Sequence, residues 1–144
     1  MNGTKDEFFA GGSIAVVGVS RKKGFGNLAF RELKKRGLRV FPVNREATEV
    51  QGEKCYQTLA DLPEKVDGVL AVVPPAETEA IVADCAKLGI KRIWMQQGAE
   101  SITAIQRCDE NGIAVVDHAC ILMHASPTGM HALHRWVWKV LGKL

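Results

Sequence analysis

The chain has 144 residues and a formal net charge of +3. This length is enough for one domain with a buried core, whereas so small a net charge gives no reason to expect binding to nucleic acid. No apolar run reaches the ~18 residues that a membrane-spanning helix needs, and residues 1–7 lack the apolar segment of a signal peptide. The four cysteines (Cys55, Cys85, Cys108 and Cys120) form no C-x-x-C pair, so we expect reduced thiols and a cytoplasmic protein.

In the first half of the chain, apolar runs alternate with a helical pattern. The runs at 13–19 and 39–44 predict two strands, and the apolar spacing between them predicts a helix. Asn27 is expected to cap this helix and Gly37 to end it. The other expected elements of this half are a helix over 4–9, a loop over 46–53, an edge strand over 54–57 and a helical turn over 58–61.

The second half of the chain repeats the alternation. The continuous apolar run 68–73 is typical of a strand buried on both faces, and Pro74 and Pro75 then end the strand and begin a helix. Ser101 is expected to cap a further helix. The expected elements are strands over 68–73, 92–96 and 113–117 and helices over 76–88, 101–111 and 128–141.

This alternation predicts an α/β fold with a single doubly wound parallel sheet, Rossmann-like, with helices on both faces. We expect one domain over residues 1–144 and the strand order 3-2-1-4-5-6, with strands numbered along the chain. Ligands of such sheets bind outside the carboxyl ends of the strands. The residues at those ends are Ser20, Asn44, Arg45, Val73, Pro74, Gln97, Gly98 and His118.

The loop after the first strand has the composition of an anion site. Its glycines let the backbone turn tightly, and the next helix directs unpaired N–H groups and the positive end of its dipole toward the loop. Three consecutive cations, Arg21, Lys22 and Lys23, suit a ligand with several phosphates. The alternative is that these cations form only a solvated basic loop.

The glycine spacing does not fit an NAD site. The NAD fingerprint is G-x-G-x-x-G with an acidic residue about 20 residues later for the ribose hydroxyls. Here Gly18, Gly24 and Gly26 are spaced differently, and the second strand ends in Asn44 and Arg45. Arg45 suits an additional phosphate on the ribose better than free hydroxyls.

Five segments, taken in order, resemble a known family. They are V-G-V-S-R at 17–21, F-P-V-N at 41–44, A-V-V-P-P at 71–75, W-M-Q-Q-G at 94–98 and H-A-C-I-L at 118–122. Over about residues 8–124, the chain resembles the stand-alone CoA-binding domain proteins, which are similar to the nucleotide-binding N-terminal domain of the succinyl-CoA synthetase alpha subunit.

The resemblance implies a site for coenzyme A or an acyl-CoA at the carboxyl edge of the sheet. The diphosphate would lie against the first strand and helix, the adenosine side near Asn44 and Arg45, and walls would come from residues of the later strands. The residues expected to bind are Gly18, Val19, Ser20, Arg21, Lys22, Lys23, Gly26, Asn27, Asn44, Arg45, Val73, Pro74, Gln96, Gln97 and His118.

We therefore expect a non-catalytic, nucleotide-binding module. The synthetase transfers a phosphoryl group through a histidine in a second domain, which this chain is too short to contain. No catalytic residue is expected, and His131 and His134 share a helix face without the further ligands that a metal site needs. Two alternatives stay open: an NADP-binding, oxidoreductase-type module, and a subunit that completes an acyl-CoA ligase with a separately encoded partner.

Aromatic and thiol side chains add two expectations. Trp94 and Trp136 are expected in the core and Trp138 at a half-exposed position. Alternatively, Trp136 and Trp138 form a homodimer contact. Cys120 is either a buried, inert thiol or one that meets the thiol arm of CoA, since it follows the last strand at the proposed ligand edge. His118 and His124, if protonated, would favour its thiolate.

Overall fold

The computed structural model describes residues 8, 12–19, 24–50 and 52–117 of the chain. Its centre is a parallel sheet of five strands in the order β2-β1-β5-β6-β7, which confirms the predicted α/β fold. The strands are β1 (Ser13–Val17), β2 (Arg39–Val43), β5 (Gly68–Ala71), β6 (Arg92–Met95) and β7 (Ala114–Val116). The helices are α2 (Phe25–Lys35), the 3-10 turn η1 (Leu59–Asp61), α3 (Pro75–Leu88) and α4 (Ile102–Glu110).

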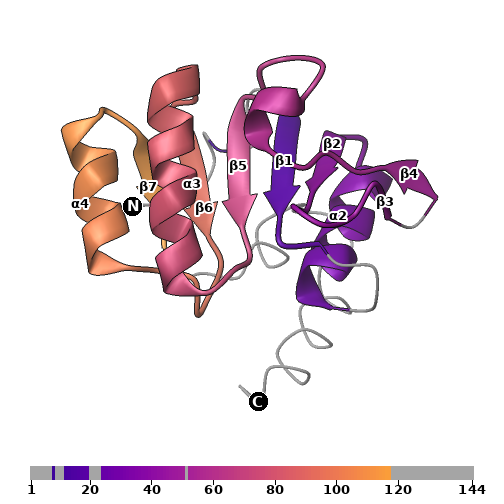
Figure 1. Ribbon diagram of the computed structural model, residues 1–144, viewed down its shortest axis with the longest axis horizontal. Helices are drawn as coiled ribbons and strands as arrows, with labels where there is room; N and C mark the ends of the chain where they lie inside the picture. Colours follow the sequence, from indigo (N-terminus) through magenta and orange to yellow (C-terminus); the bar gives the residue numbers. More distant parts are fainter. Residues whose placement is uncertain (1–7, 9–11, 20–23, 51, 118–144) are drawn as a thin grey trace.

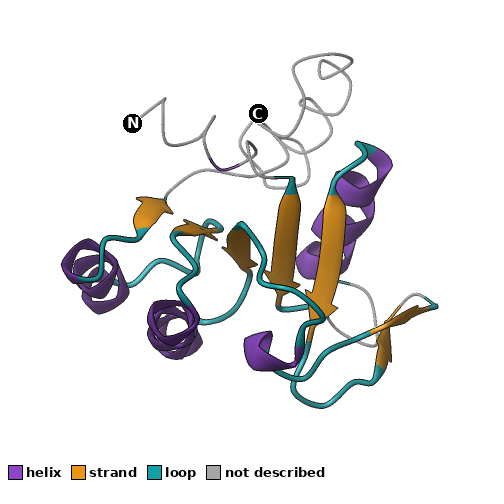
Figure 2. Cartoon of the chain, turned by 90° about the horizontal axis from the view of Figure 1, so that it is seen from above, coloured by secondary structure: helices purple, strands orange, loops and turns teal. Residues whose placement is uncertain are grey.

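Helices cover both faces of this sheet (Figures 1 and 2). Helix α2 lies on one face, and α3, α4 and η1 lie on the other. Side chains alternate between the two faces along each strand, so that Ile14 and Val16 belong to the core beneath α2, whereas Ala15 and Val17 belong to the layer beneath α3. Trp94 is fully buried in the α2 layer, as predicted, where its ring meets that of Phe8 edge-on at 5.4 Å.

Several helix boundaries follow from the capping chemistry of the sequence. The Ser101 hydroxyl accepts a hydrogen bond from the Ala104 N–H and so caps α4. Pro75 is the first residue of α3, and Gly89 ends that helix in the left-handed conformation with φ +74°. These contacts are local, and each confirms a predicted helix end.

The predicted third strand is wrong. Over residues 54–57, only Tyr56 pairs with the main sheet, through an isolated parallel bridge to Val43. Two residues later, Thr58 is already the N-cap of η1. The pairing with β2 is therefore not extended into a strand. Instead, β4 (Glu53–Lys54) pairs antiparallel with β3 (Glu49–Val50), in a segment expected to be a loop. Gly52, at φ +79°, allows the tight turn between these two strands, and the other five strands keep their predicted order.

The predicted cap of α2 is also wrong. The helix begins at Phe25 with Gly24 at the N-cap, and no side chain caps it. Asn27 lies inside the first turn and is 3% exposed. The helix starts earlier because glycine at position 26 lets its first turn pack directly against the end of β1, as detailed below.

Some expectations fall outside the described residues. These are the helix over 128–141 with its two tryptophans, and all of the helix over 4–9 except Phe8. None of the helices in the described part of the chain combines the length and the apolar character that crossing a bilayer requires. That residues 1–144 form a single domain stays a prediction.

Candidate functional site

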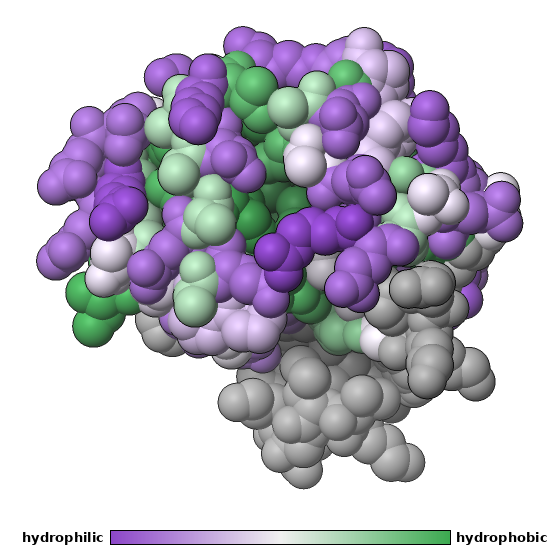
Figure 3. Space-filling model, in the orientation of Figure 1, coloured by the Kyte–Doolittle hydropathy of each residue, from purple (hydrophilic) through white to green (hydrophobic). Residues whose placement is uncertain are grey.

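A pocket of about 330 Å³ opens where the carboxyl ends of β1, β2 and β5 meet the α3–η1 side of the sheet. Figure 3 shows this hollow, with apolar residues at its base and polar residues around its mouth. Strand ends, the first three turns of α3 and the start of η1 with the residues before it all contribute to its walls. The lining residues are Val17, Gly18, Val43, Asn44, Arg45, Glu46, Gln57, Thr58, Leu59, Val73, Glu77, Ala80, Ile81 and Asp84.

Two glycines allow the backbone to converge beside this pocket. Gly18 follows β1 with φ +121°, and a Cβ atom there would lie 2.0 Å from the Val72 carbonyl oxygen. A Cβ atom on Gly26 would lie 2.4 Å from the Gly18 carbonyl oxygen. No larger residue fits either position without movement of the backbone. The end of β1, the end of β5 and the first turn of α2 are therefore held in direct contact.

The N-terminus of α2 has the electrostatics of an anion site. No side chain in the described part of the chain caps it, and its first turn contains no acidic residue. The positive end of the helix dipole is therefore not compensated by a carboxylate within that turn. Helix α4, by contrast, is capped by Ser101, and α3 has Glu77 in its first turn. The predicted phosphate ligands Ser20, Arg21, Lys22 and Lys23 lie outside the described residues.

Asn44 shapes the loop after β2. Its Nδ2 donates to the Val19 carbonyl oxygen at 2.6 Å, while its Oδ1 accepts from the N–H groups of Glu46 at 2.7 Å and Ala47 at 3.1 Å. Asn44 lines the pocket, but its side-chain oxygen already holds the turn after β2, and its amide nitrogen ties that turn to Val19, just after β1. We therefore interpret Asn44 as a positioning residue.

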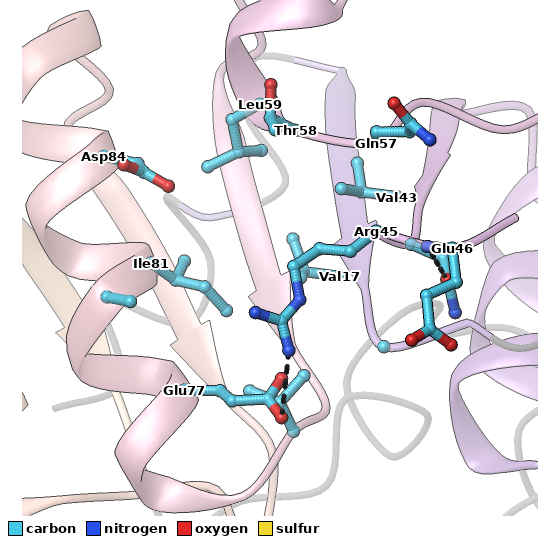
Figure 4. A pocket seen from close by; sticks show the side chains of 14 residues that line it. Val17, Val43, Arg45, Glu46, Gln57, Thr58, Leu59, Glu77, Ile81 and Asp84 are labelled. Carbon is cyan, nitrogen blue, oxygen red and sulfur yellow. Dashed lines mark hydrogen bonds and ion pairs between the residues drawn. The ribbon is translucent and has the colours of Figure 1, made fainter.

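Arg45 reaches across the mouth of the pocket. Its side chain is 80% exposed, and its Nη2 lies 3.9 Å from Oε1 of Glu77, whose side chain is 48% exposed. Figure 4 shows the guanidinium over the pocket, directed at the first turn of α3. Glu46 and Asp84 also line the pocket. Its described lining thus contains one cation and three carboxylates. Among the described residues, the feature of this edge that suits an anion is therefore the N-terminus of α2, not the pocket walls.

Sequence reasoning did not select the acidic residues of α3. Glu77 and Asp84 are seven residues apart, with Ala80 and Ile81 between them, which is the spacing of one helix face. Because α3 starts at the carboxyl end of β5, its first turns necessarily stand beside the ligand edge. This combination of periodicity and position could have identified the α3 wall.

The predicted site residues fall into separate groups in space. Gly18, Asn44, Arg45 and Val73 line the pocket. Val19, Gly26 and Asn27 are buried beside it, between the end of β1 and α2. Pro74 is exposed and serves as the N-cap of α3.

The predicted residues that directly follow β6 do not line the pocket. Gln96 is buried and Gln97 is exposed, and neither lines it. They begin a turn that the Gln96 carbonyl closes by accepting from the Ala99 N–H at 2.8 Å. Gly98 has φ +93° in this turn. His118 lies outside the described residues.

The cysteines within the described residues are buried, free thiols: Cys55, Cys85 and Cys108. Burial raises the pKa of Cys85 to about 12 and that of Cys108 to about 11, and it also raises the pKa of the Cys55 thiol. All three are therefore protonated and poorly nucleophilic near neutral pH. Nor do the described residues include any group of three or more His, Cys, Asp or Glu side chains placed to hold a metal ion. Cys120, His131 and His134 lie outside them.

A family model described as a CoA binding domain matches residues 12–126. The chain belongs to the CoA binding domain family. Over 90 residues, this CoA binding domain is 37% identical to the alpha subunit of acetate–CoA ligase [ADP-forming] II from Pyrococcus furiosus. That alignment covers 61% of this chain and only 20% of the relative, so the chain corresponds to about a fifth of the ligase subunit.

Solved structures share the fold of this CoA binding domain. A conserved hypothetical protein from Pyrococcus furiosus has a TM-score of 0.72 and 34% identity, covering 76% of this chain and 95% of that one. The apo form of a dinucleotide-forming acetyl-coenzyme A synthetase 1 from Ca. Korarchaeum cryptofilum has a TM-score of 0.64 and 31% identity. The match covers 72% of this chain and 25% of the synthetase. The Rossmann-like fold and the relation to acetate–CoA ligase and acetyl-coenzyme A synthetase chains are thus established.

Proposed function

We propose that this chain is a module that binds CoA or an acyl-CoA at the carboxyl edge of its sheet. The observation that carries the proposal is the N-terminus of α2, which has no side-chain cap from the described residues and no acidic residue in its first turn. It packs through Gly26 against the end of β1. A phosphate placed there would receive backbone N–H groups and the positive end of the helix dipole. Membership in the CoA binding domain family supports CoA as the bearer of that phosphate.

In this proposal, the ligand runs along the strand ends. Its diphosphate lies against the segment from Gly18 to Asn27, where Ser20, Arg21, Lys22 and Lys23 supply hydroxyl and cationic groups. The adenosine side occupies the pocket, with Val73 and Pro74 as an apolar wall. A volume of about 330 Å³ is near the lower end of the range of ~300–1,000 Å³ for small-molecule sites, which suits one part of an extended ligand.

Arg45 is assigned to the phosphate on the ribose of CoA. Its guanidinium is exposed and projects over the pocket from the end of β2 (Figure 4). A guanidinium pairs well with phosphate oxygens because its planar N–H groups match their geometry. Gln97 and His118 follow β6 and β7. They are assigned to the part of the site that would hold the thiol-bearing arm of CoA. Gln96 is buried and would act by shaping the turn that carries Gln97.

We assign no catalytic residue to the described part of the chain, so any acyl transfer would need groups from elsewhere. Bound CoA supplies a thiol that carries an acyl group as a thioester. The relatives include an ADP-forming acetate–CoA ligase subunit, which supports a second candidate function, in which this module completes such a ligase with a catalytic partner. Co-purification with a ligase-type subunit, followed by an assay for acyl-CoA formation, would distinguish this role from simple CoA storage.

The experiment that tests the proposal is titration calorimetry with CoA, NAD and NADP, together with native mass spectrometry of the purified protein. We expect CoA to bind more tightly than either dinucleotide and a CoA species to co-purify. NADP is the demanding competitor, since it also carries a phosphate on an adenosine ribose. Tighter binding of NAD than of CoA would overturn the proposal.

A further inference from the structure

We infer that Glu77 tunes the preference of this site for a ligand with a ribose phosphate. Glu77 pairs with Arg45 across the pocket, and the phosphate must displace the Glu77 carboxylate from the guanidinium in order to bind. This inference rests on the proposed binding of CoA and assigns a role to a residue on the opposite wall. The two side chains come from separate elements, Arg45 from the end of β2 and Glu77 from the first turn of α3. Their contact spans the mouth of the pocket (Figure 4).

The geometry of this ion pair makes it easy to exchange. The separation of 3.9 Å is at the long end for an ion pair, and the two side chains are 80% and 48% exposed. Such a pair is weak and is screened by salt. A dianionic phosphate can approach the guanidinium more closely and pair with it through two N–H groups. A ligand with this phosphate therefore displaces Glu77 from Arg45, whereas a ligand without the phosphate leaves the ion pair intact.

The other carboxylates of the pocket do not share this position. Figure 4 shows Asp84 farther along α3 and the Glu46 carboxylate pointing to the other side of Arg45, away from its guanidinium. Glu77 alone among them has an ion pair with Arg45 within the described residues. Its role is to compete with the phosphate, so that its removal should favour ligands that carry one.

CoA and dephospho-CoA differ only by the ribose phosphate, so the ratio of their dissociation constants reports on this competition. At low salt, Glu77→Gln should raise the preference for CoA over dephospho-CoA by about two- to fivefold, the range expected for an exposed pair. The gain should shrink as the salt concentration rises. In an Arg45→Gln background, the same substitution should leave the ratio unchanged. Glu110→Gln, which removes an equal charge from α4 outside the pocket, should also leave it unchanged.

Each outcome of this double-mutant cycle has a clear meaning. Equal changes in the affinities for CoA and dephospho-CoA would show that the charge of Glu77 acts on both ligands alike and not on the ribose phosphate. That result would overturn the inference. A changed ratio in the Arg45→Gln background would overturn it as well. If the wild-type chain binds CoA and the ratio does not respond to Glu77→Gln, the inference fails alone. If the wild-type chain does not bind CoA, the proposed function fails and the inference fails with it. Thermal melts of each variant confirm that it is folded.

Discussion

The uncapped N-terminus of α2 allows fold stability and ligand affinity to be shifted in opposite directions by one substitution. Gly24 is the N-cap residue, is exposed, and has an extended backbone with φ 176°, which any residue can adopt. Aspartate is among the preferred N-cap residues because its carboxylate accepts a backbone N–H and complements the helix dipole. Gly24→Asp should therefore stabilise the free protein by about 0.5–1 kcal/mol and raise Tm by roughly 2–4 °C.

The same carboxylate would occupy the proposed position of the CoA diphosphate. It would satisfy the N–H groups that the phosphate needs and would repel its charge. Since a hydrogen bond to a charged group contributes about 1.5–3 kcal/mol, we expect CoA to bind about ten- to hundredfold more weakly. Calorimetry of CoA binding and thermal denaturation of the free protein measure the two effects separately.

Two matched variants isolate the cause. Gly24→Ser can cap the helix without a charge and should weaken CoA binding by less than tenfold, whereas Gly24→Ala cannot cap it and should bind nearly as the wild type does. The difference between the Asp and Ser variants should fall at high salt. A Gly24→Asp protein that is more stable and yet binds CoA with unchanged affinity would refute the assignment of the diphosphate to this helix end.

Two further predictions concern the same edge. Replacing Arg21 and Lys22 together by alanine should weaken CoA binding by up to about 3 kcal/mol per lost contact at low salt and by less at high salt. An unchanged dissociation constant at low salt would mean that these cations are exposed to solvent and do not contact the ligand. Gly18→Ala should lower the free energy of unfolding by about 2–5 kcal/mol, measured by urea denaturation. The new Cβ atom would collide with the Val72 carbonyl, and alanine rarely adopts the φ of +121° found at this position. The control Gly37→Ala, with φ +86° and nothing within 4 Å of the new atom, should cost only about 1–2 kcal/mol, and equal losses would contradict the packing argument.

Local chemistry explains which parts of the fold were predictable. Ser101 caps α4 and Gly89 ends α3 because each depends on hydrogen bonds and backbone angles within a few residues. The run that becomes β5 was predictable for another reason, since a strand with helices over both faces of its sheet needs apolar side chains in both directions. The error at Asn27 had a tertiary cause, since the contact between Gly26 and the end of β1 decides where α2 begins.

The candidate site was predictable where the topology alone brings residues together. Gly18, Asn44 and Val73 line one pocket because they follow strands that are neighbours in the sheet. The α3 wall was missed because the strand-end rule selects residues next to strands, while Glu77 and Asp84 reach the pocket from a helix face. The short β3–β4 pair was missed since its pairing depends on a turn at Gly52 within an otherwise polar segment.

The buried thiols give a sharp test of whether Cys120 meets the ligand. In the proposed reaction, the Cys120 thiolate attacks one sulfur of oxidised CoA, forming a protein–CoA disulfide and releasing the second CoA as a thiolate. Cys55, Cys85 and Cys108 are buried, and burial raises the pKa of each, so these three act as internal controls that should not react in the folded protein.

We expect one added CoA per chain after incubation near neutral pH, mapped to the peptide that contains Cys120 by digestion without reductant. The adduct should disappear in Cys120→Ser. An excess of dephospho-CoA should slow its formation if the reaction follows binding at the strand edge, because the competitor then occupies the site. Unfolding the protein in urea should expose all four thiols to modification, which shows that protection of the other three comes from the fold. Modification of Cys55, Cys85 or Cys108 in the folded protein, with none at Cys120, would mean that the CoA arm does not reach the end of the last strand.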